Sequence, residues 1–153
     1  MKIFTILLLL FVSKFYSQGV SKNMENVKYS YKTDKPFLHY DSTKKNLNYL
    51  KYFKADNDNK SLLIFYMLSK DSIKIVSGGK IINEDRFPTN TTSVRSIQPI
   101  SNQKSLEIIF FRENVAEKIT ITSEDLKKYK FVYISPKESP LQIEYTNIWK
   151  MFM

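Results

Sequence analysis

The clearest alternation of hydrophobic and polar positions lies between Ser105 and Ser135. It predicts three successive β-strands, because β-branched and aromatic residues dominate three short runs and turn-forming residues separate them. This stretch therefore predicts an antiparallel sheet with a buried core. The three runs are Leu106–Phe111, Lys118–Thr122 and Phe131–Ile134.

Strand patterns continue on both sides of this stretch. Leu62–Leu68 is apolar throughout, which is typical of a strand buried on both faces. The polar stretch from Asn83 to Ser93 contains Pro88 and predicts a long surface loop. Further strands are predicted at Val27–Tyr31, Ile73–Val76, Lys80–Ile82, Val94–Ile100 and Leu141–Tyr145.

The stretch from Lys44 to Phe53 fits two patterns. Leu47, Leu50 and Phe53 recur at a spacing of three, which predicts the apolar side of a short helix. Leu47, Tyr49 and Phe53 also lie at alternating positions, as in a strand. We favour the helix and keep the strand as the alternative.

Two segments nearer the C-terminus have local signals of their own. Thr122 and Asp125 have the spacing of a capping box, which predicts one or two helical turns from Ser123 to Lys130. An apolar tail follows the last predicted strand, and we expect it to pack on the core. Its members are Ile148, Trp149, Met151 and Phe152.

About seven or eight short strands with one or two short helices predict a mainly β fold. The regular spacing of strands and turns favours an antiparallel β-sandwich or an open barrel. The alternative is an α+β fold, an antiparallel sheet with one packed helix, and it depends on residues 44–53.

The N-terminal residues predict export. Lys2 precedes an apolar run of ten residues, Ile3–Val12, which is too short for a bilayer that needs about 20. We expect residues 1–19 to be a signal peptide, cut near Ser17 or Gly19, and residues 20–153 to form a single exported β-rich domain. The protein is then expected in the periplasm or outside the cell, with no transmembrane segment after signal removal.

The charge is strongly basic, with 24 lysines and arginines against 15 acidic residues. The predicted signal peptide holds two of these lysines, so the exported chain has a net charge of +7. Such a charge suits nucleic acid or an anionic surface. Only three basic residues are arginines, the usual readers of bases and phosphates, so we expect no nucleic-acid partner.

The sequence offers little for catalysis or metal binding. It has no cysteine, one histidine (His39) and three glycines, which excludes cysteine–histidine catalysis, histidine metal clusters and glycine-rich phosphate loops. Residues 56–59 resemble the start of a calcium loop, but Lys60 and Ser61 replace a ligand and the turn glycine. We therefore expect no cofactor and no metal, and we assign no catalytic residue.

Two kinds of side chain remain as binding candidates. Tyrosine joins an apolar ring to a polar tip, which suits sugar and protein surfaces. The segment 84–86 forms the most concentrated polar cluster, at the edge of the predicted loop. The candidate binding residues are Tyr29, Tyr31, Tyr49, Tyr52, Glu84, Asp85, Arg86 and Tyr145.

These observations favour an exported binding or protein-interaction module without enzymatic activity, whose partner is a protein or an envelope glycan. One alternative is a hydrolase of envelope glycans that uses an acidic pair, Glu84-Asp85 or Glu124-Asp125. The other is a small carrier of lipids or hydrophobic molecules, in which the sheet closes around a cavity.

Overall fold

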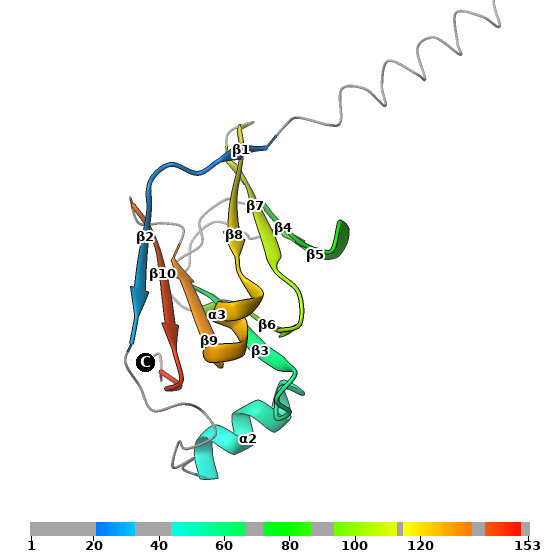
Figure 1. The fold of residues 1–153 in the computed structure, drawn as a ribbon, viewed down its shortest axis with the longest axis vertical. Helices are drawn as coiled ribbons and strands as arrows, with labels where there is room; N and C mark the ends of the chain where they lie inside the picture. Colours follow the sequence, from blue (N-terminus) through cyan, green and yellow to red (C-terminus); the bar gives the residue numbers. More distant parts are fainter. Residues whose placement is uncertain are drawn as a thin grey trace, which may run out of the picture.

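The computed structural model describes residues 21–32, 44–66, 72–86, 94–112, 115–135 and 140–150. These residues form ten strands in two five-stranded sheets, with two short helices (Figure 1). The predicted mainly β fold is confirmed, and the sheets do not close into a barrel. The predicted signal peptide, His39, Met151 and Phe152 lie outside the described residues.

Sheet A, the first of the two sheets, has the strand order β1-β8-β7-β4-β5. Its last hairpin turns through Gly78 and Gly79, which have φ values of +56° and +76° that favour glycine. β5 continues beyond the predicted end at Ile82, because Asn83 to Arg86 pair with β4; the loop predicted to begin at Asn83 was wrong for these residues. The strands are β1 (Lys22–Asn23), β4 (Ser72–Ser77), β5 (Lys80–Arg86), β7 (Leu106–Arg112) and β8 (Val115–Ile121).

Sheet B has the order β2-β10-β9-β3-β6. Both sheets are mixed, whereas the sequence pattern predicted antiparallel ones: β2–β10, β3–β9 and β1–β8 are parallel pairs. Two parallel neighbours need a long crossover connection between them. The hydrophobic alternation along one strand does not show whether its neighbour is parallel or antiparallel. The strands are β2 (Val27–Tyr31), β3 (Lys60–Tyr66), β6 (Val94–Ser101), β9 (Phe131–Ser135) and β10 (Leu141–Thr146).

The three strands predicted between Ser105 and Ser135 are all present, but they do not share a sheet. β7 and β8 form an antiparallel hairpin in sheet A, and β9 lies in sheet B. Helix α3 (Ser123–Lys128) connects β8 to β9. Its N-cap is Thr122, whose hydroxyl accepts a 3.0 Å hydrogen bond from the Asp125 N–H, as the capping-box spacing predicted.

The space between the sheets is filled by one core of seventeen buried residues. Leu63 and Phe65 enter it from β3, Ile108 and Phe110 enter it from β7, and Leu126 of α3 closes one end. The inner faces of both sheets are therefore apolar, as in a β-sandwich.

A second apolar cluster lies on the outer face of sheet B. Helix α2 (Lys44–Tyr52) lies next to β3 (Figure 1). The helix and the turn after it place Leu50 and Ala55 against Leu62, Ile64 and Phe131. β3 is thus buried on both faces, as its continuous apolar run predicted. The molecule combines the predicted sandwich with the helix of the alternative, and neither described helix has the length and apolar content needed to cross a membrane.

Candidate functional site

The predicted tyrosines fall into two groups instead of one common face. Tyr49 and Tyr52 lie on α2, outside sheet B, where they meet other aromatic side chains. Tyr29 and Tyr31 lie on β2 and pair in register with β10, which carries Tyr145. The group on α2 forms the better candidate site.

The last turns of α2 border an open cavity of about 410 Å³, lined by Asn48, Tyr49, Tyr52 and Phe53. Tyr52 is 79% exposed, so its ring is available to a ligand. Leu50, between these positions, is fully buried and fixes the helix to the sheet. We call Asn48, Tyr49, Tyr52, Phe53 and the adjacent Trp149 the aromatic site.

Ring contacts hold the aromatic site together. Tyr49 stacks on Trp149, with centroids 4.9 Å apart and planes at 17°, and Tyr52 meets Phe53 edge to face at 4.9 Å. Trp149 also packs against Phe131 of β9, at 5.6 Å between centroids. Because Trp149 contacts both α2 and sheet B, it fixes the orientation of the Tyr49 ring.

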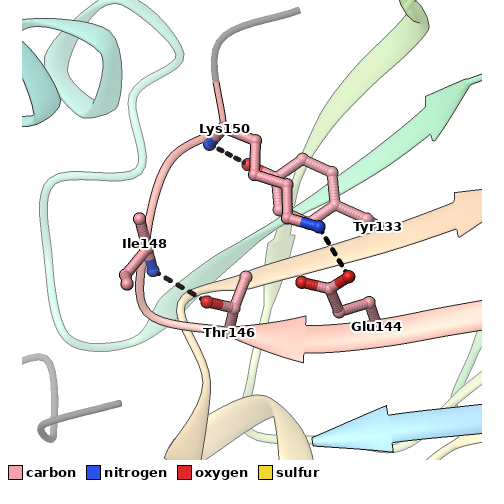
Figure 2. A network of polar contacts seen from close by, with 5 residues as sticks. All are labelled: Tyr133, Glu144, Thr146, Ile148 and Lys150. Carbon is pink, nitrogen blue, oxygen red and sulfur yellow. Dashed lines mark hydrogen bonds and ion pairs between the residues drawn. The ribbon is translucent and has the colours of Figure 1, made fainter. Parts of the chain in front are cut away.

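Polar contacts hold the segment after β10, which contains Trp149, and Figure 2 shows these contacts. The Lys150 N–H donates to the Tyr133 hydroxyl at 2.8 Å, and the Lys150 ammonium pairs with Glu144 Oε2. The same ammonium lies 5.3 Å from the centre of the Tyr133 ring. Ile148 N–H donates to Thr146 Oγ1 at 3.0 Å. These contacts hold the segment that carries Trp149, the residue on which the Tyr49 ring stacks.

The tyrosine in this network is strongly buried, with 1% of its surface exposed. Burial raises the pKa of Tyr133 far above its ordinary value, and the nearby Glu144 carboxylate raises it further, against the lowering effect of the hydrogen bond from Lys150. Tyr133 therefore stays neutral at physiological pH and acts as a fixed hydrogen-bond acceptor for the C-terminal segment.

The surroundings of the aromatic site are basic. Residues 44–55 contain four lysines and no acidic residue. Lys51 and Lys54 are exposed, and neither takes part in an ion pair with another described residue. The site therefore combines exposed aromatic rings with positive charge.

The acidic residues next to α2 face a buried lysine. Lys130 is 5% exposed, and its ammonium donates to the carbonyl oxygens of Asn57 and Lys60. Burial lowers the pKa of Lys130, while Asp58 and Asp56 oppose this shift. The loop that resembles a calcium site thus contributes a carbonyl oxygen to an ammonium group, and its two aspartates favour the charged form of that group.

The second tyrosine group closes the edge of the sandwich. Tyr31 stacks on Tyr145 with centroids 4.9 Å apart and planes at 6°. Tyr145 is buried, so it is not part of a surface, whereas Tyr29 and Tyr31 are 43% and 50% exposed. Burial and the nearby Asp125 carboxylate raise the pKa of Tyr29 and Tyr31. This group mainly covers core residues.

The predicted polar cluster at residues 84–86 belongs to β5, at the edge of sheet A, and does not join the aromatic site. Glu84 pairs with Lys74 of the neighbouring strand at 3.4 Å, and the two backbones are in register. Asp85 and Arg86 pair through their backbones with Ile73 and Ser72. Glu84 therefore helps to hold β4 and β5 together.

Three members of the aromatic site were missing from the sequence-based candidates: Asn48, Phe53 and Trp149. Phe53 and Trp149 were assigned to the apolar side of the helix and to the packed tail, and both pack on the second apolar cluster, whereas Ile148 of the same tail is exposed. Nothing in the sequence indicates that Trp149 meets Tyr49, a residue 100 positions earlier. Asn48 has no local signal beyond its position one residue before Tyr49.

Metal binding receives no support from the described part of the chain, where no group of three or more histidine, aspartate or glutamate side chains is placed to hold an ion. Comparison with protein-family models, with curated proteins and with solved structures finds no match to this chain.

Proposed function

We propose that this chain is an exported binding module without enzymatic activity, and that the aromatic site is its recognition surface. One observation carries the proposal: a mostly exposed tyrosine ring, Tyr52, borders a cavity whose other aromatic walls are held by packing on Trp149. Rigid aromatic rings with little freedom to lose are the usual anchors of binding surfaces.

The chemistry of the cavity favours binding over catalysis. Its described walls are three aromatic rings and the Asn48 amide, and their only titratable groups are tyrosine hydroxyls. A glycoside hydrolase needs two carboxylates within about 5–9.5 Å of each other. Glu84 lies on β5 and Glu124 follows β8, three strand spacings away in sheet A, about 14 Å or more. Glu84 and Glu124 therefore do not form such a pair.

The carrier alternative requires room between the sheets. Seventeen buried side chains occupy that space, among them Phe65, Phe110 and Tyr145. A hydrophobic ligand entering there would have to displace packed side chains, at a cost of several kcal/mol. Binding at the aromatic site needs no such rearrangement.

The test is to express residues 20–153 in the native periplasm and to identify copurifying molecules by mass spectrometry. Three forms are compared: the unchanged chain, Tyr52→Ala, and the control Ile81→Ala, which removes another exposed apolar side chain, on β5. The proposal expects one stoichiometric partner with the unchanged chain and the control, and at least tenfold less with Tyr52→Ala. Equal retention by all three forms contradicts it.

A further inference from the structure

We propose that the ligand of the aromatic site is an acidic glycan, a chain of sugar rings that carry carboxylates. This inference rests on the proposed function and names the chemistry of the ligand. It follows from the aromatic walls, the size of the cavity and the charge around it.

The walls suit a sugar ring. The apolar face of a sugar stacks on an aromatic ring, and Tyr52 presents such a ring to solvent. The exposed Asn48 side chain at the same cavity offers both a donor and an acceptor for sugar hydroxyls. A volume of about 410 Å³ lies in the range of small-ligand pockets. The hollow therefore fits one or two sugar rings better than it fits a flat lipid surface.

The positive charge near the aromatic site favours glycans that carry negative charge over neutral ones. Lys51 precedes Tyr52 directly and Lys54 follows Phe53 directly, and both side chains are exposed. Of the neighbouring acids, Glu144 pairs with Lys150, and Asp56 and Asp58 are shared with the buried ammonium of Lys130, whose charged form they favour. The four lysines of residues 44–55 outnumber these two aspartates, so the local charge attracts an anion. Carboxylates on the sugar chain complement it, whereas a neutral glycan gains nothing from it.

The experiment is calorimetric titration of residues 20–153 with trigalacturonate and with the neutral trisaccharide maltotriose. We expect trigalacturonate to bind at least tenfold more tightly, and 0.5 M NaCl to weaken its binding severalfold by screening. Tyr52→Ala should weaken binding about tenfold. The double variant Lys51→Gln/Lys54→Gln should weaken it about fivefold. The matched control Lys28→Gln/Lys32→Gln removes two exposed lysines of the β2 region and should stay within twofold.

Each other outcome overturns the inference in a distinguishable way. Equal binding of both sugars, lost in Tyr52→Ala, rejects the acidic ligand and leaves the proposed function standing. Trigalacturonate binding that Tyr52→Ala does not change reveals non-specific charge attraction. Absence of binding to trigalacturonate rejects the inference outright. If phosphatidylglycerol vesicles bind instead of the sugar, and Tyr52→Ala weakens that binding, the aromatic site recognises a membrane surface. Thermal unfolding followed by circular dichroism verifies that each variant is folded.

Discussion

The backbone N–H of Lys150 donates a 2.8 Å hydrogen bond to the hydroxyl of Tyr133, directly beside the ring contacts of Trp149. The bond joins the C-terminal segment to β9, in the middle of sheet B. Through Trp149, the same segment supports the Tyr49 ring of α2. The geometry of the aromatic site therefore depends on a contact between two residues that do not line the cavity themselves.

Removing that hydroxyl should destabilise the protein and loosen Trp149. We expect Tyr133→Phe to lower the free energy of unfolding by about 1–1.5 kcal/mol, because the Lys150 N–H loses its partner while the ring packing stays. Urea denaturation followed by circular dichroism measures the loss. Tyr52→Phe is the matched control, since its hydroxyl belongs to an exposed side chain and should change stability by less than about 0.5 kcal/mol. Equal stability of both variants would contradict the role given to this bond.

Lys130 should stabilise the folded loop between α2 and β3. In Lys130→Met the side chain keeps its apolar stem. It loses the ammonium that donates to the carbonyl oxygens of Asn57 and Lys60. Hydrogen bonds to a charged group contribute about 1.5–3 kcal/mol, and we expect a loss of stability in that range. Lys127→Met, at an exposed position of α3, is the control. A Lys130→Met protein as stable as the control would show that water replaces the ammonium.

The N-cap of α3 makes a smaller, local contribution. Thr122→Ala should lower the free energy of unfolding by about 1 kcal/mol, because the Asp125 N–H loses its acceptor. Thr122→Ser keeps the hydroxyl and should recover most of the loss. Chemical denaturation of the three proteins under identical conditions gives the comparison, and equal losses in Ala and Ser would reject the capping role.

Stability should fall at alkaline pH because of buried tyrosines. Burial raises the pKa of Tyr133 and Tyr145 above the ordinary value of 10.0. Their stabilising contribution is complete below pH 10 and is lost above it, because the unfolded chain ionises there while the folded chain keeps its protons. Each group changes the unfolding free energy by up to about 1.4 kcal/mol per pH unit.

Tyr145→Phe isolates one of these two groups. Denaturation at pH 8 and pH 11 should show a smaller drop in stability for the variant than for the unchanged protein. Lys130, whose lowered pKa gives a slope of opposite sign, is present in both proteins and cancels in the comparison. An identical drop in the two proteins would mean that Tyr145 ionises in the folded state.

Much of the fold could be predicted from the sequence because it depends on local patterns. The burial of β3 follows from its continuous apolar run and the cap of α3 from its spacing, whereas only Trp149 of the described tail residues Ile148 and Trp149 packs as predicted. The ambiguity at residues 44–53 is resolved in favour of the helix. This helix buries Leu50 fully against sheet B. The alternative strand pattern would instead have placed Leu50 on the face opposite Leu47, Tyr49 and Phe53.

Strand partners and the aromatic site could not be predicted, because they depend on long-range contacts. β9 follows β8 along the chain yet pairs with β3, about 70 residues earlier, and alternation carries no information about such partners. Tyr145 has the same alternating pattern as an edge tyrosine but is buried under Tyr31. A buried lysine such as Lys130 contradicts the usual exposure of lysine and has no sequence signal.

The most direct test of the binding proposal uses the only tryptophan of the sequence, Trp149, as a reporter within the aromatic site. Its fluorescence is followed while the molecule that copurifies from the periplasm is titrated into residues 20–153 and into Tyr52→Ala. We predict a saturable change in the unchanged protein, with an affinity at least tenfold weaker in Tyr52→Ala. Binding that leaves the Trp149 signal constant, or that is equally tight in both proteins, would place the recognition surface elsewhere and contradict the account.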